Sequence, residues 1–140
     1  MFVVDASVAG MWFLEETLSD AARGLLASEY ELVAPDLLHS EVGNAVLRAV
    51  RRGEITESSG DTAIRFLLPQ VVRLMRTSDR AYEAFELARR FGGSVYDATY
   101  LVLGATLDVP VITNDKQMMK TAAAAGIKAC AIADGPPPLP

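Results

Sequence analysis

Short apolar segments alternate with helix-like segments along the 140-residue chain, and this alternation constrains the fold more than any other feature. Five segments rich in small and β-branched apolar residues are too short for helices, and they predict strands at residues 2–4, 32–34, 71–74, 109–113 and 127–132. Between them, apolar residues recur at the helical period. Strands that alternate with helices form a parallel sheet covered on both faces, so we expect an α/β domain.

Capping and breaking residues predict where the helices begin and end. Ser19, Thr56 and Ser94 are favourable N-caps, Gly126 is a favourable C-terminal residue, and Pro69 is expected to end the helix before it. Two helices fall between the third and fourth strands, which suits a long crossover from one edge of the sheet to beyond its centre. The expected helices cover residues 7–14, 20–28, 37–52, 57–68, 79–91, 95–107 and 116–125.

The composition describes a globular, rather apolar chain with an excess of acids. Hydrophobic residues make up 51% of the sequence, and the formal net charge is −5. This charge repels nucleic acid, so a phosphate partner requires local cations or a metal. The single Cys130 excludes an intrachain disulfide, and no segment resembles a signal peptide or a membrane span. We expect one domain at residues 1–134, a flexible proline-rich tail at 135–140 and a cytoplasmic location.

Four acids are expected at one edge of the predicted sheet. Asp5 and Asp115 follow the first and fourth strands, Glu41 lies in the second turn of the helix after the second strand, and Asp97 lies in the first turn of a helix. Carboxyl ends of parallel strands and amino ends of the helices that follow them share an edge. Each acid also has a structural explanation: Asp5 as an N-cap, Asp97 and Asp115 as partners of helix dipoles, and Glu41 as a solvated residue.

Crowded carboxylates without histidine or cysteine favour a hard cation, Mg²⁺ or Mn²⁺. Such a site suits attack of a metal-activated water on a phosphodiester. The hydroxyls of Ser7 and Thr113 are placed to orient a carboxylate or a water. Asn44 shares the helix face of Glu41, and Arg48 continues that face as a candidate contact for RNA, although cations near a helix end are also common for electrostatic reasons.

This ordered set of segments resembles a PIN domain of the VapC-type toxins found in toxin–antitoxin pairs. The resemblance implies a three-layer α/β/α fold with a five-stranded parallel sheet in the order 3-2-1-4-5. It also implies a Mg²⁺- or Mn²⁺-dependent ribonuclease, a homodimer and a cognate VapB-like antitoxin. Asp5, Asp97 and Asp115 would be metal ligands, with Glu41 completing the catalytic quartet. The matching segments are residues 2–8, 12–16, 34–38, 41–45, 96–101 and 111–115.

Other readings of the same pattern fit less well. A haloacid-dehalogenase-type phosphatase needs a second aspartate where Ser7 stands, and a dinucleotide-binding domain needs a glycine-rich turn after the first strand. The alternative that remains is a catalytically silent PIN-fold domain that binds proteins. Tyr96 and Tyr100 are expected to be packing residues, and Gly104 departs from the family's usual alanine, which predicts a local weakening of its helix.

Overall fold

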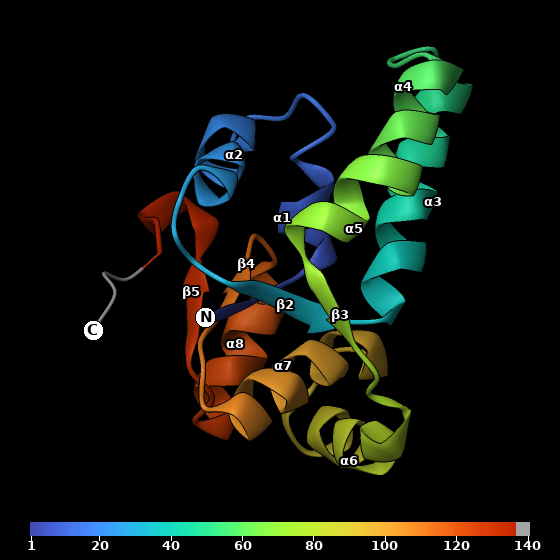
Figure 1. Cartoon of the computed structure of the whole chain (residues 1–140). Coiled ribbons are helices and arrows are strands. Elements are labelled where there is room, and N and C mark those ends of the chain that lie inside the picture. The colour runs from blue at the N-terminus through green and yellow to red at the C-terminus, as the bar shows by residue number, and fades with distance from the viewer. Residues whose placement is uncertain (137–140) are drawn as a thin grey trace.

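Five parallel strands form one sheet in the order β3-β2-β1-β4-β5 in the computed structural model, which describes residues 1–136 (Figure 1). This order and the parallel pairing confirm the expected α/β fold. β1 is the central strand, with β2 on one side and β4 on the other. The strands are β1 (Phe2–Val4), β2 (Leu32–Pro35), β3 (Arg73–Met75), β4 (Val111–Thr113) and β5 (Ala129–Ala131).

The central strands are apolar on both faces because helices cover both faces. Val3 of β1 pairs with Val33 of β2 and with Val111 of β4, and all three side chains are fully buried. Val4 and Ile112 form the next pair and are also fully buried. Continuous apolar runs of this kind are typical of the strands of a parallel sheet. They fix the position of whatever follows each strand at the carboxyl edge.

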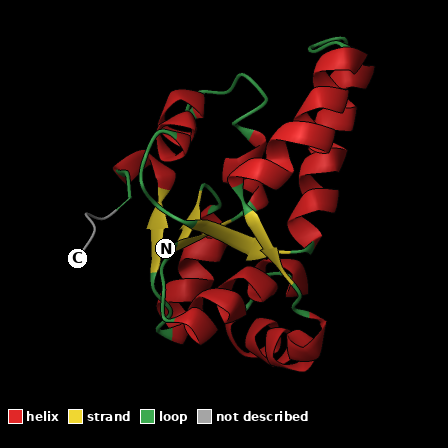
Figure 2. Ribbon diagram, viewed as in Figure 1, coloured by secondary structure: helices red, strands yellow, loops and turns green. Residues whose placement is uncertain are grey.

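Two layers of helices enclose the sheet (Figure 2). One layer holds α1 to α5 with the π-helical segment η1, and the other holds α6, α7 and α8 (Figure 1). Two 3₁₀ turns, η2 (Ser78–Arg80) and η3 (Ile132–Asp134), follow β3 and β5. The helices are α1 (Ala6–Gly10), α2 (Ser19–Leu26), α3 (Leu37–Arg51), α4 (Glu57–Thr62), η1 (Ala63–Leu67), α5 (Leu68–Val71), α6 (Ala81–Phe91), α7 (Val95–Leu107) and α8 (Lys116–Ala125).

The α7 helix is apolar around much of its circumference and lies close against β1, β2 and β4. Gly104 explains how closely it approaches. A Cβ atom at this position would lie 2.7 Å from Cγ2 of Val111 and 3.1 Å from the carbonyl oxygen of Val109. The glycine is therefore required by packing, and the expectation that it only weakens the helix locally was incomplete.

Several expected boundaries were wrong. The first helix begins at Ala6 instead of residue 7, because the side chain of Asp5 caps it one residue earlier, and it ends at Gly10 instead of residue 14. Pro69 does not end a helix. It occupies one of the first two positions of α5, where its missing N–H removes no hydrogen bond of that helix. The third strand consequently begins at Arg73. The predicted tail at 135–140 lies outside the described residues from 137 onward.

Candidate functional site

Asp5 lies at the carboxyl end of β1 and begins α1. Its side chain is only 3% exposed, although it carries a carboxyl group. Oδ1 accepts a hydrogen bond from the backbone N–H of Val8 at 3.1 Å, which is the N-cap arrangement. The central strand and the short helix together hold this carboxylate at the edge of the sheet.

Two hydroxyl groups complete the surroundings of the Asp5 carboxylate. The hydroxyl of Ser7 lies 2.7 Å from Oδ1 and 2.9 Å from Oδ2, so its single proton is shared between the two oxygens. The hydroxyl of Thr113, at the end of β4, donates to Oδ2 at 2.8 Å. The Ser7 hydroxyl oxygen in turn accepts a hydrogen bond from the backbone N–H of Asn114 at 3.0 Å. The Thr113 hydroxyl oxygen accepts one from the backbone N–H of Asp115 at 2.9 Å. The network ties the end of β1 to the β4–α8 connection.

Asp115 is the N-cap of α8. Its Oδ1 accepts the backbone N–H groups of Gln117 and Met118 at 2.7 and 3.0 Å. Oδ2 has no donor among the described residues, so half of this carboxylate is available to a ligand. The capping explanation is correct for Asp115, and it leaves room for a second role.

Asp97 lies in the first turn of α7, whose N-cap is Ser94. The backbone N–H of Asp97 donates to the Ser94 hydroxyl at 3.0 Å. The side chain of Asp97 is partly exposed and accepts no hydrogen bond from any residue in the described part of the chain. Its carboxylate is thus held at a helix amino end, where the dipole favours negative charge, without a protein partner.

Glu41 lies on α3, in the other helix layer, and is joined to α7 by a hydrogen bond. The hydroxyl of Tyr100 donates to Oε1 of Glu41 at 3.0 Å. Tyr100 is 1% exposed, and the raised pKa of its hydroxyl follows from burial and from the negative charges of Glu41, Asp5 and Asp97. The charges of three of the four acids therefore act on the same hydroxyl group, so these three acids lie near one another.

The ionisation of Asp5 and Glu41 is disfavoured by burial and by the charge of a neighbouring acid. Burial raises the pKa of Asp5 to about 6, hydrogen bonds from Ser7, Thr113 and Val8 oppose the rise, and the charge of Asp115 adds to it. Burial also raises the pKa of Glu41, with opposition from the Tyr100 hydrogen bond and a further increase from Asp97. Within residues 1–136, no ion pair supplies a cation to any of the four acids.

The acids are neighbours without forming a closed cage. Among residues 1–136, no group of three or more acidic, histidine or cysteine side chains is close enough to hold a metal ion by itself. Mg²⁺ commonly binds through one or two carboxylates, keeps several waters and takes phosphate oxygens of the substrate. The all-oxygen donors and the uncompensated negative charge therefore fit such an ion, whose remaining ligands would be waters and substrate.

A cavity of about 340 Å³ opens beside Glu41, and Asp5, Asp97 and Asp115 are not among the residues that line it. Glu41 and Ser7 line it together with Arg48 and Asn114, and a smaller cavity of about 140 Å³ continues past Arg48 to Arg52. Arg48 is exposed and has no ion-pair partner in the described structure. Asn44 is exposed but does not line either cavity, so the structure brings Arg48 to the site and leaves Asn44 beside it.

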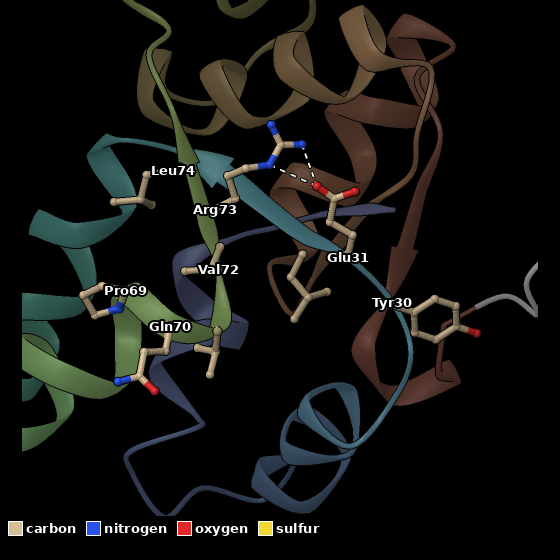
Figure 3. A pocket seen from close by; sticks show the side chains of 9 residues that line it. Tyr30, Glu31, Pro69, Gln70, Val72, Arg73 and Leu74 are labelled. Carbon is tan, nitrogen blue, oxygen red and sulfur yellow. Dashed lines mark hydrogen bonds and ion pairs between the residues drawn. The ribbon is translucent and has the colours of Figure 1, made fainter.

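A larger cavity lies elsewhere. It measures about 560 Å³ and is bounded by the segments at the amino ends of β2 and β3, at the opposite edge of the sheet (Figure 3). Glu31 and Arg73 form an ion pair of 2.7 Å at its wall, and both groups are exposed. None of the four acids lines this cavity. Size alone therefore does not identify a functional site, and the four acids lie at the carboxyl edge of the sheet.

Two residues of the site were not recognised in the sequence. Tyr100 was expected to be a packing residue, yet its hydroxyl binds Glu41. Its position three residues after Asp97, on the same face of α7, was the available signal. Asn114 had no expected role, and its backbone N–H donates a hydrogen bond to the hydroxyl oxygen of Ser7. A backbone contact of this kind has no signal in the residue type.

Comparisons with known proteins agree with this fold. The PIN domain family model matches residues 2–124. The chain is 37% identical over 105 residues to Ribonuclease VapC1 of Mycobacterium tuberculosis, covering 75% of each protein. It is 29% identical over 118 residues to Ribonuclease VapC3 of Pyrobaculum aerophilum, covering 83% of this chain and 90% of that protein.

Two solved structures share the architecture. The structure of PAE2754 from Pyrobaculum aerophilum aligns with a TM-score of 0.73 at 18% identity and covers 95% of this chain and 91% of that one. The structure of Mycobacterium tuberculosis VapC20, described as a toxin that cleaves the sarcin–ricin loop, aligns with a TM-score of 0.68 at 20% identity, covering 91% and 96%. At these identities the likeness concerns the fold.

Proposed function

Because the chain belongs to the PIN domain family and, within it, to the VapC ribonucleases, we propose that it is the toxin of a toxin–antitoxin pair and hydrolyses RNA at the acidic edge of its sheet. The reaction is the attack of water on a phosphodiester, which breaks one P–O bond. The catalytic residues are Asp5, Glu41, Asp97 and Asp115.

One observation carries this proposal: acids from four separate segments lie at one edge, where the charge of Asp115 raises the pKa of Asp5 and the charge of Asp97 raises the pKa of Glu41. Within residues 1–136, none of the four acids has an ion-pair partner. A protein that used these residues only for capping and solubility would have no reason to bury Asp5 to 3% exposure. A site for a divalent cation explains why the chain keeps a buried carboxylate at this position despite the desolvation cost.

We assign the cation-binding role to Asp5, Asp97 and Asp115, one or two of which would bind the ion directly and the remainder through water, with Glu41 acting directly or through a water. Bound Mg²⁺ or Mn²⁺ would supply activation of the attacking water and neutralisation of charge on the phosphate. The chain's own contribution is orientation. Ser7 and Thr113 hold the Asp5 carboxylate by hydrogen bonds, so its oxygens are fixed before any ligand arrives.

Arg48 would supply a cationic contact for the RNA backbone beside Glu41. Arg48 lines the cavity that Glu41 also lines, and a guanidinium group is well suited to phosphate oxygens. Asn44, on the exposed side of α3, is a second candidate contact for a phosphate or a metal-bound water. Because the net charge is −5, binding of RNA would depend on this local cation and on the metal.

The family also indicates the partners: a VapB-like antitoxin and a second copy of the chain. Exposed apolar side chains supply surfaces for such contacts, with Phe66 and Leu67 at 54% and 45% exposure and Tyr82 and Phe85 at 73% and 51%. No helix among residues 1–136 is long and apolar enough to cross a membrane. We assign the protein to the cytoplasm, where RNA and antitoxin are made.

The proposal is tested by measuring cleavage of a mixed-sequence RNA by the purified protein with Mg²⁺, with Mn²⁺ and with a chelator. We expect metal-dependent cleavage that falls at least 100-fold in Asp5→Asn. Asp61→Asn changes the charge equally at an exposed position of α4 and should cleave like the wild type. Expression in cells should arrest growth for the wild type and not for Asp5→Asn.

Other results would reject the assignment. Equal cleavage by Asp5→Asn and the wild type would place the reaction elsewhere in the chain. Absence of cleavage by the wild type under all metal conditions, together with growth unaffected by its expression, would favour the catalytically silent interaction domain.

A further inference from the structure

The hydrogen bond between Tyr100 and Glu41 joins the two helix layers at the edge of the sheet. Glu41 belongs to α3 and Tyr100 to α7, and the two residues are 59 positions apart in the sequence. The phenol oxygen lies 3.0 Å from Oε1 of Glu41, and the tyrosine is 1% exposed. This contact is the one that fixes the most flexible of the four acidic side chains.

The surroundings of Tyr100 keep its hydroxyl in the donating form. Burial raises the pKa of this group, and the charges of Glu41, Asp5 and Asp97 raise it further. Burial and these charges therefore favour the protonated hydroxyl, which is the form that donates to Oε1 of Glu41. A neutral hydroxyl group can hold the Glu41 carboxylate without adding charge to the site.

The second oxygen of Glu41 is left available. Oε2 accepts no hydrogen bond from any residue in the described part of the chain, whereas Oε1 is bound to Tyr100. A glutamate side chain has several rotatable bonds and loses much conformational freedom when it binds a ligand. A hydrogen bond that restricts the free side chain reduces this loss, and partners that orient metal-binding carboxylates act in this way.

We propose that Tyr100 is a positioning residue: its hydroxyl holds the Glu41 carboxylate beside Asp97 and thereby strengthens binding of a divalent cation at the candidate site. This inference rests on the proposed function, since it gives Tyr100 a role in the same site. A tyrosine that served packing alone would need its ring and not its hydroxyl.

The test compares Mn²⁺ binding by the full chain, measured by isothermal titration calorimetry, in the wild type, Tyr100→Phe and Tyr96→Phe. Removing the hydroxyl from Tyr100 should weaken Mn²⁺ binding by about 10-fold, the lower end for loss of an orienting partner. Tyr96 lies four residues earlier on the same helix and is 69% exposed, so its phenylalanine variant should bind Mn²⁺ like the wild type. Mn²⁺ affinity within twofold of the wild type for Tyr100→Phe would overturn the inference.

A double-mutant cycle separates positioning from a general loss of structure. Glu41→Ala should weaken Mn²⁺ binding at least as much as Tyr100→Phe, and adding Tyr100→Phe to Glu41→Ala should cause no further loss. A full additional loss in the double variant would show that the hydroxyl acts independently of Glu41, and the inference would fail. Thermal unfolding of each variant establishes that it is folded at the titration temperature.

The outcomes distinguish this inference from the proposed function. A wild type that binds Mn²⁺ and cleaves RNA, with Tyr100→Phe equal to it in Mn²⁺ affinity, overturns only the role of Tyr100. A wild type that neither binds Mn²⁺ nor cleaves RNA overturns both.

Discussion

At the scale of single residues, Asp5 is an N-cap and also lies where its proposed catalytic role requires it, and the sequence presented these two roles as alternatives. Its carboxylate caps α1 through Val8, and the same carboxylate is buried at the carboxyl edge beside Asp115. Its identity and position at the strand end could be read from the sequence. Its hydrogen bonds with Ser7 and Thr113 could not, because they depend on side-chain rotamers and on which strand lies next to β1.

The raised pKa of Asp5 predicts how stability depends on pH when metal is removed by a chelator. The folded-state pKa of about 6 exceeds the ordinary value of 3.8, so the folded protein binds this proton more tightly than the unfolded chain. The resulting stabilisation is present below about pH 4 and is lost as pH rises through 6. A shift of about two units corresponds to about 3 kcal/mol.

Asp5→Asn removes this ionisation. Relative to the wild type, its free energy of unfolding should therefore rise by an amount of that order between pH 4 and pH 7, as measured by urea titration. Asp61→Asn, at an exposed site, should show no such trend. A difference in the free energy of unfolding between Asp5→Asn and the wild type that stays constant across this range would contradict the burial of Asp5 without an ion-pair partner.

At the scale of elements, the spacing of apolar residues and the capping residues predicted most helix and strand positions. The boundaries that were predicted wrongly have physical causes. The helix at 57–68 was expected to stop at Pro69, but η1 inserts a π turn and α5 continues through the proline. Such a turn depends on how the segment packs against α3, which a local pattern does not contain. The close approach of α7 to β4 could likewise not be predicted from the sequence, although Gly104 stands out there as a glycine within a helix.

Gly104→Ala should destabilise the protein even though alanine favours helices. The added Cβ would meet Val111 and the carbonyl of Val109, and overpacking of this kind costs about 1–3 kcal/mol. Gly24→Ala is the matched control, because a Cβ at this position in α2 meets nothing within 4 Å. It should raise the free energy of unfolding by about 0.5–1 kcal/mol. Thermal or urea unfolding measures both, and equal stabilisation by the two substitutions would contradict the packing of α7.

At the scale of the whole molecule, the strand order brings the acids together. β1 lies between β2 and β4, so the acids that follow these strands meet at one edge, and α7 adds Asp97 from the other helix layer. Alternation of strands and helices was sufficient to predict this edge, whereas the strand order was implied by the family resemblance. The cavity beside Arg48 and the contact of Tyr100 depend on three-dimensional packing and could not be predicted.

The most direct test of the central claim is anomalous diffraction from crystals of the protein grown with Mn²⁺. We predict an anomalous peak in direct contact with carboxylate oxygens of Asp5, Asp97 or Asp115, on the side of the cavity lined by Glu41, and its loss in Asp5→Asn crystals. A peak confined to acids elsewhere, such as Glu15 and Glu16, or crystals with no peak at this edge at saturating Mn²⁺, would contradict the metal-dependent site.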